Sequence, residues 1–158
     1  MNFSSNDILC PCKSNKAYQA CCQPLHDGHV MANSAQQLMC SRYSAFVLKN
    51  TPYLIATLHP SQHEVDDETV LKQTMAQTHW LGLKIIQHRQ KGKIATVEFA
   101  AFYQGESSTE QLHEKSNFIL DNNRWFYLDG EILPAIKLSR NELCFCGSGK
   151  KVKKCHVK

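Results

Sequence analysis

Residues 83–128 read LKIIQHRQKGKIATVEFAAFYQGESSTEQLHEKSNFILDNNRWFYL, and this stretch decides the fold. It contains four runs rich in β-branched and aromatic residues, at 83–88, 94–103, 111–120 and 124–128. Short segments with turn-forming glycine, serine and asparagine separate the runs, and their lengths suit hairpins. The stretch therefore predicts an antiparallel sheet of four consecutive strands.

The residues before this sheet predict helices. Ser34 begins a capping box, and apolar residues follow it at helical spacing, which predicts a helix over about 34–49. Thr51-Pro52 places a cap before a proline and predicts a second, short helix, while Asp66-Asp67 predict the start of a third. Helices followed by an antiparallel meander indicate an α+β fold, with a curved sheet packed on the long helix.

One cysteine-rich pattern occurs at both ends of the chain. Residues 10–22 and residues 144–156 both read C-x-C-x-S-x-K-x-x-x-x-C-[C/H]. Seven of the eight cysteines fall inside the two copies, so the pattern is an internal repeat rather than a chance recurrence. The eighth, Cys40, lies in the predicted long helix, where we expect a small buried hydrophobic residue.

Each copy offers four metal ligands within thirteen residues. Zinc takes four tetrahedral ligands, and a closed set of cysteine and histidine is typical of structural sites. Neighbouring cysteines must lie in a turn to reach one ion, and His26 or His29 remain alternatives to Cys22 as the fourth ligand of the first site. The predicted ligands are Cys10, Cys12, Cys21 and Cys22 at one end, and Cys144, Cys146, Cys155 and His156 at the other.

Disulfides and iron–sulfur clusters explain the repeat less well than zinc. A disulfide between Cys21 and Cys22 would be strained, and the second copy would keep an odd thiol. Zinc is favoured over iron–sulfur because one set contains a histidine. We expect two zinc sites, with the second copy the stronger of the two, and we expect both to be structural because no ligand position is left open for water.

Positive charge is concentrated at the carboxyl end. Residues 137–158 contain seven basic residues and one acidic residue, a formal charge of +6, whereas the whole chain carries +4. Such a segment favours contact with an anionic partner, such as RNA or an acidic protein patch. The predicted partner-binding residues are Lys150, Lys151, Lys153 and Lys154.

The remaining composition describes an ordinary globular protein. Hydrophobic residues make up 42% of the chain and charged residues 20%. No apolar run approaches the ~18 residues of a membrane span, and no secretory signal is visible at the start of the sequence. A cytoplasmic location is expected, where thiols stay reduced.

The second copy resembles the SEC-C zinc motif at the carboxyl end of the SecA translocation ATPase, including its Gly-Ser-Gly-Lys-Lys core. In the first copy Lys13 and Asn15 replace the glycines, which weakens the resemblance there. The two copies together with motifs such as Trp80-Leu81-Gly82-Leu83 make the chain similar to the YchJ-like family of SEC-C proteins. The resemblance implies a middle domain of the cystatin-like or nuclear-transport-factor-two-like (NTF2-like) fold, and no established reaction. We predict three parts: a zinc knuckle at 1–29, an α+β domain at 30–136 and a second knuckle at 137–158.

A curved sheet packed on a long helix often encloses a pocket, and Arg42 is the candidate residue for binding a ligand there. It lies four residues after Leu38 and four before Phe46, on or beside the apolar stripe of the long helix. A partly buried arginine needs an anion or several acceptors. We favour an internal ion pair with Glu98 or Glu114, and the alternative is a pocket that binds a carboxylate or phosphate.

Two functions compete on this evidence. The first is a zinc-binding adaptor that docks through its basic C-terminal knuckle to a protein or RNA. The alternative is a small-molecule-binding protein or enzyme that uses the middle pocket. No catalytic residue is predicted, because five histidines of the middle region, His59, His63, His79, His88 and His113, share no spacing that unites a base with its orienting partner.

Overall fold

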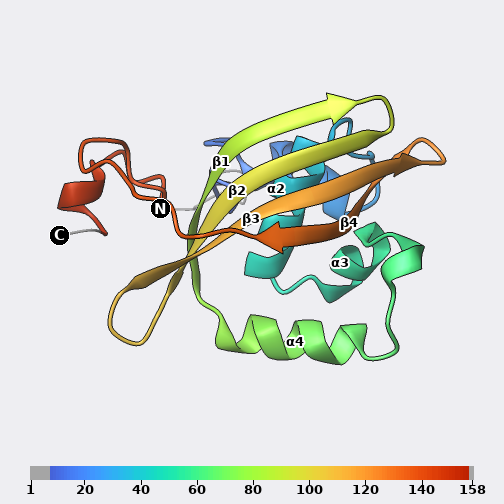
Figure 1. The fold of residues 1–158 in the computed structure, drawn as a ribbon, viewed down its shortest axis with the longest axis horizontal. Coiled ribbons are helices and arrows are strands. Elements are labelled where there is room, and N and C mark those ends of the chain that lie inside the picture. The colour runs from blue at the N-terminus through green and yellow to red at the C-terminus, as the bar shows by residue number, and fades with distance from the viewer. Residues whose placement is uncertain (1–7, 157–158) are drawn as a thin grey trace, which may run out of the picture.

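The computed structural model describes residues 8–156, and its middle part is a four-stranded antiparallel sheet in the order β1-β2-β3-β4. The sheet is long and curved, and the helix α2 lies across one of its faces (Figure 1). The α+β class and the meander are therefore confirmed. The strands are β1 (Trp80–Lys91), β2 (Ile94–Gln104), β3 (Thr109–Asp121) and β4 (Arg124–Ile132).

Turns and bulges shape this sheet. Asn122 and Asn123 have φ of 50° and 61°, the left-handed geometry that favoured two-residue hairpin turns require. Register shifts interrupt β1 twice and β4 once, and such bulges bend a strand and increase its twist. The strands extend past the apolar runs, because polar residues such as Gln90 and Glu131 continue the hydrogen-bonded ladders.

The helices begin close to the predicted positions. The Ser34 side chain accepts a hydrogen bond from the Gln37 backbone N–H at 3.1 Å and caps α2. The cap of α3 is Asn50 rather than Thr51, because the Asn50 side chain accepts from the Tyr53 N–H at 3.2 Å. The helices are α1 (Gln23–His26), α2 (Ala35–Val47), α3 (Thr51–Thr57) and α4 (Asp67–Gln77), with 3₁₀ turns at Tyr18–Ala20, Pro60–Gln62 and Val152–Lys154.

Apolar residues gather in three clusters. The largest lies between α2 and the inner face of the sheet, and it includes Leu38, Val97 and Phe118. A second lies on the opposite face of the sheet and joins Phe102 to the C-terminal segment. The third joins α2, α3 and α4, and Met75 is the buried residue that α4 contributes to it. None of the helices within residues 8–156 combines the length and apolar character that a membrane crossing requires.

Candidate metal centres

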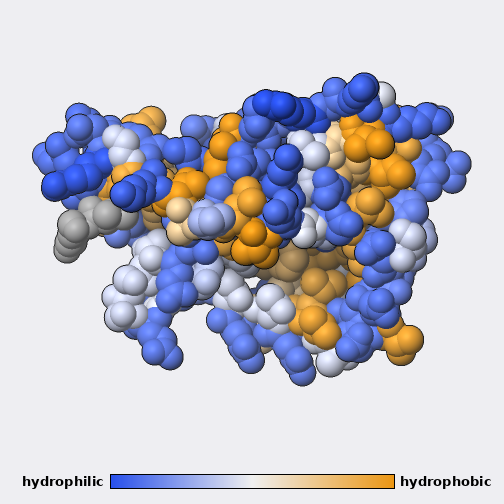
Figure 2. Space-filling model, viewed as in Figure 1, coloured by the Kyte–Doolittle hydropathy of each residue, from blue (hydrophilic) through white to orange (hydrophobic). Residues whose placement is uncertain are grey.

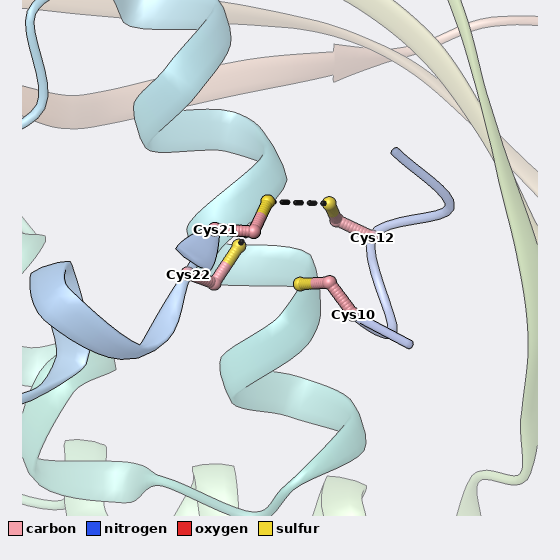
Figure 3. Close-up of side chains that lie close together, drawn as sticks. All are labelled: Cys10, Cys12, Cys21 and Cys22. Carbon is pink, nitrogen blue, oxygen red and sulfur yellow. Dashed lines mark hydrogen bonds between the residues drawn. The ribbon is translucent and has the colours of Figure 1, made fainter. Parts of the chain in front are cut away.

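Four cysteines from residues 10–22 converge beside α2. Cys10 and Cys12 come from one loop, and Cys21 and Cys22 follow a 3₁₀ turn and lead into α1 (Figure 3). The Sγ atoms of Cys12 and Cys21 are 3.6 Å apart, and those of Cys21 and Cys22 are 3.9 Å apart. All four ligand atoms lie within 4.8 Å of one another, so this group could hold one metal ion.

The second copy of the repeat forms an equivalent group at the other end of the chain. Cys144, Cys146, Cys155 and His156 also place their ligand atoms within 4.8 Å of one another. The His156 Nδ1 lies 3.2 Å from the sulfur of Cys144 and 3.2 Å from that of Cys155. The sulfurs of Cys146 and Cys155 are 3.5 Å apart.

These distances fit the geometry of zinc. A tetrahedral site with Zn–S bonds of ~2.3 Å has sulfur atoms about 3.8 Å apart. The sulfur–sulfur separations of 3.5, 3.6 and 3.9 Å lie around that value. All eight cysteines are free thiols, so none of the ligands is consumed in a disulfide.

At both sites the same backbone geometry allows two adjacent residues to point toward one metal ion. Cys21 has φ −128° and ψ −95°, and Cys155 has φ −128° and ψ −85°. Both values lie outside the strand geometry in which neighbouring side chains point to opposite faces. This shared turn brings Cys22 and His156 to the same side as the residue before them.

The loops between the cysteines are also equivalent. The Cys10 N–H donates to the Lys16 carbonyl at 2.8 Å, and the Cys144 N–H donates to the Lys150 carbonyl at 2.8 Å. Gly147 has φ 78°, and the residue in its place in the first copy, Lys13, has φ 67°. The first loop therefore keeps the fold of the repeat although it lacks the glycines.

Both nitrogens of His26 are engaged away from the thiols. Its Nδ1 lies 2.6 Å from the Tyr18 hydroxyl, and its Nε2 lies 2.8 Å from the Ser41 carbonyl. His29 is exposed and does not belong to the group. The structure thus brings Cys22, rather than either histidine, to the other three cysteines.

The N-terminal group is built into the main core. Cys10 and Cys22 are each only 2% exposed and pack within the cluster between α2 and the sheet. The hydroxyl of Ser44 on α2 donates to the Cys22 sulfur at 3.3 Å and lies 3.5 Å from the Cys10 sulfur. Such neighbours orient metal ligands. Sequence reasoning missed Ser44, because its contact with Cys22 joins residues that are 22 positions apart.

The C-terminal group packs on the outer face of the sheet. The ring of Phe145 stacks on Phe102 with 3.9 Å between centroids and 7° between planes. Lys84 of β1 pairs with Glu142 at 2.6 Å. At Gly82 a Cβ would lie 2.2 Å from the Phe145 carbonyl oxygen, so the approach needs a glycine.

Neighbouring groups shift the ionisation of the thiols. Hydrogen bonds with Cys10 and Cys22 lower the pKa of Cys12, whereas hydrogen bonds with Cys10 and Cys12 raise the pKa of Cys22. Burial by itself would raise the pKa of Cys146, but hydrogen bonds from Ser148 help to lower that pKa to about 6. Since metals bind the thiolate, the lowered pKa values of Cys12 and Cys146 favour the metal-binding form of these two side chains.

Free positive charge surrounds the C-terminal group. Lys150, Lys151 and Lys154 are exposed and Lys153 is half-buried, and none of them pairs with a carboxylate among residues 8–156. The Cδ of Lys13 lies 3.5 Å from the point where a Cβ on Gly147 would be. The two cysteine loops are therefore neighbours in space, and a lysine of the first reaches the second.

Arg42 does not form the ion pair expected from the sequence. It is 8% exposed, and its Nη1 donates to the Leu54 carbonyl at 2.8 Å and to the Thr57 hydroxyl at 2.6 Å. Within residues 8–156 no carboxylate lies within 4 Å of its guanidinium. Glu98 instead contacts His113 at 3.1 Å.

Comparisons with known proteins agree with this architecture. Residues 34–130 match the family described as YchJ, middle NTF2-like domain, and residues 8–24 and 140–156 match the SEC-C motif. The chain belongs to the YchJ-like family. A UPF0225 protein of Vibrio cholerae is 42% identical over 151 residues, covering 94% of this chain and 99% of that protein. A UPF0225 protein of Shewanella sp. is 41% identical over 165 residues, covering 98% and 99%.

Two solved structures are similar to this chain over most of its length. A SEC-C motif containing protein from Psychrobacter arcticus is 32% identical, with a TM-score of 0.73 and coverage of 95% of this chain and 96% of that chain. A SEC-C motif containing protein from Rhodopseudomonas palustris is 34% identical, with a TM-score of 0.75 and coverage of 80% and 100%. The family and the NTF2-like middle domain predicted from the sequence are confirmed.

Proposed function

We propose that both cysteine groups bind structural zinc and that the protein is an adaptor, which docks through its basic C-terminal knuckle onto a negatively charged protein or RNA. The observation that carries the docking proposal is the set of four lysines around the C-terminal group that lack carboxylate partners among the described residues. The single acidic residue of that knuckle, Glu142, is already paired with Lys84. The positive charge of the four lysines is therefore not neutralised by a carboxylate side chain of the knuckle itself.

The donor sets favour a structural metal. Each group offers four protein ligands of the cysteine and histidine type, which suits zinc and leaves no position for a reacting water. Bound zinc would supply cross-links that hold each loop closed. Four thiolates would leave the first site with a charge of about −2, and three thiolates with a neutral histidine would leave the second with about −1. The positive charge of the four lysines exceeds the negative charge of about −1 at the second site.

Neighbouring residues enlarge the basic surface. Lys13 from the first loop reaches Gly147 in the second, so a partner on the C-terminal knuckle would also meet the first loop. Leu143 is 69% exposed beside the same lysines and adds an apolar contact. We place this binding in the cytoplasm, where the thiols stay reduced and able to hold metal.

Capture from a cell lysate under reducing conditions tests the docking proposal. The full-length zinc-loaded chain is compared with a variant in which Lys150, Lys151, Lys153 and Lys154 are alanine. A matched control replaces four other exposed lysines, Lys49, Lys91, Lys93 and Lys115, and so has the same net charge. We expect capture to fail for the first variant only, and equal capture by all three proteins would contradict the proposal.

Nuclease treatment and salt separate the two kinds of partner. If the partner is RNA, ribonuclease abolishes capture, and the affinity for single-stranded RNA falls with salt with a slope of about −0.7 for each phosphate contacted. If the partner is an acidic protein, capture survives ribonuclease and still depends on the four lysines. Zinc analysis of the purified chain is expected to give about two equivalents for four-ligand sites at both ends.

A further inference from the structure

A pocket of about 410 Å³ lies between α2, α4 and the inner face of the sheet. Its lining residues fall between positions 39 and 127, so the lysines of the C-terminal knuckle are not among them. The surface is hollowed between the sheet and α4, and hydrophobic side chains are visible inside this hollow (Figure 2). A pocket of 300–1,000 Å³ is the size that small-molecule ligands use. Its walls and its polar groups therefore indicate what it binds.

The walls of the pocket are aromatic. Trp80 lies at the centre of a set of edge-on ring contacts, with centroid distances of 6.0 Å to Tyr43, 6.4 Å to Phe46 and 5.7 Å to Tyr103. All four residues line the pocket. Aromatic faces and edges of this kind pack well against a flat apolar group.

One cation in the pocket has spare hydrogen-bond donors. Arg42 uses Nη1 for the Leu54 carbonyl and the Thr57 hydroxyl, and its guanidinium lies 4.7 Å from the centroid of the Tyr127 ring. Its Nε and Nη2 have no protein acceptor among the described residues. Because a buried charge is costly without a counter-charge, these N–H groups favour an anionic ligand.

One anion in the pocket has a spare acceptor. The Glu114 Oε1 accepts from the Ser116 hydroxyl at 2.7 Å and from the Tyr127 hydroxyl at 3.0 Å, while Oε2 accepts from no group among the described residues. Tyr127 thus contacts both charged side chains, which lie more than 4 Å apart. The indole N–H of Trp80 is buried and also lacks a partner within residues 8–156. Buried polar groups normally have a partner, so the pocket is prepared for a polar ligand.

We propose that this pocket binds a small zwitterion with a flat apolar body, with the chemistry of an aromatic α-amino acid. The carboxylate pairs with the free N–H groups of Arg42, the ammonium pairs with the free oxygen of Glu114, and the ring lies among Trp80 and its aromatic neighbours. A ligand with only one charge would leave either the free N–H groups of Arg42 or the free oxygen of Glu114 without a counter-charge, which is why both charges are required. This proposal is independent of metal binding and of the C-terminal lysines.

Nuclear magnetic resonance on the ¹⁵N-labelled, zinc-loaded full-length chain tests the site. L-phenylalanine and L-tryptophan are titrated while the indole N–H signal of Trp80 is followed, and a Trp80→Phe variant assigns that signal. We expect a saturable shift of this signal. Two analogues of phenylalanine that each lack one charge, 3-phenylpropionate and phenethylamine, should bind at least about tenfold more weakly, because each loses a charge-assisted hydrogen bond.

Replacing Glu114 by the uncharged glutamine tests whether this residue binds the ammonium group of the ligand. Glu114→Gln keeps an oxygen for Ser116 and Tyr127, and it should weaken phenylalanine about tenfold while leaving 3-phenylpropionate unchanged. Glu131→Gln on β4 is the matched control, since Glu131 is exposed and does not line the pocket. Arg42 is not replaced, because it also anchors α3 to α2. The proposal is wrong if the Trp80 signal does not move at millimolar amino acid, if the analogues bind as well as phenylalanine, or if Glu114→Gln has no effect.

Discussion

Lys13 and Asn15 take the places of two glycines in the repeat and still adopt their backbone geometry, with φ of 67° and 66° against 78° and 81° for Gly147 and Gly149. In a residue with a Cβ this conformation brings the Cβ close to the following carbonyl oxygen, and lysine lacks the short polar side chain with which asparagine can hydrogen-bond locally and offset the cost. The cysteine pair on either side of the loop therefore fixes the backbone at Lys13.

Substitutions at these positions should shift stability in opposite directions. Lys13→Gly should stabilise the protein by about 0.5–1 kcal/mol, because it removes the left-handed strain, while Gly149→Ala should destabilise the second loop by about 1–2 kcal/mol. Among the described residues other than its chain neighbours, no atom lies within 4 Å of a Cβ built on Gly149, so the predicted loss comes from backbone strain. Chemical denaturation of both variants measures the change, and a destabilised Lys13→Gly protein would contradict this reasoning.

Residue types and spacing were enough to predict which side chains gather into the two groups that could hold a metal ion, but not the partners of Arg42. Ligand spacing is local, since each group lies within thirteen residues. The expected pair with Glu98 fails because neighbouring residues of a strand face opposite sides, and Val97 and Phe99 face the core beneath α2. Glu98 therefore faces away from Arg42, and only the strand register reveals this.

At the scale of elements, the sheet presents two different faces to the ends of the chain. Its inner face packs against α2 and the N-terminal cysteines, and its outer face holds the C-terminal knuckle through the stacked rings of Phe102 and Phe145. The apolar runs predicted the strands because their β-branched and aromatic residues continue over both faces. They could not assign a face to either knuckle, because that choice depends on contacts such as Gly82 with Phe145.

Gly82→Ala should detach the C-terminal knuckle from the sheet. The added methyl group would lie 2.2 Å from the Phe145 carbonyl oxygen, which is backbone and cannot swing away. Limited proteolysis should then cleave near residues 133–141 at least about tenfold faster, as expected for the loss of a packed contact worth ~1.4 kcal/mol or more. Gly105→Ala is the control, because the atoms nearest to its methyl group belong to the flexible side chain of Glu110 rather than to backbone. Equal cleavage of both variants would show that Gly82 does not position the knuckle.

At the scale of the whole molecule, the two copies of the cysteine motif pack differently against the middle domain. Cys10, Cys12 and Cys22 belong to the main core, and Ser44 of α2 contacts two of them. The C-terminal group shares its cluster with only one strand pair of the sheet, through residues such as Ala100 and Phe102. The first copy is therefore part of the core of the middle domain, whereas the second copy packs on the outer face of the sheet.

Removing one ligand from each group should reveal this division. Cys22→Ser should lower the zinc content from two equivalents to one and reduce the melting temperature of the middle domain by about 10 °C, since a loss of a few kcal/mol shifts a domain of this size by ~2–4 °C per kcal/mol. Cys155→Ser should also lose one equivalent but leave that melting temperature nearly unchanged. Fluorescence of Trp80 and Trp125, which pack in or against the main core, follows the unfolding of the middle domain in both variants. Because the two substitutions are chemically identical, an equal fall in both melting temperatures would mean that the C-terminal group also supports the core, and that its docking surface is not structurally independent.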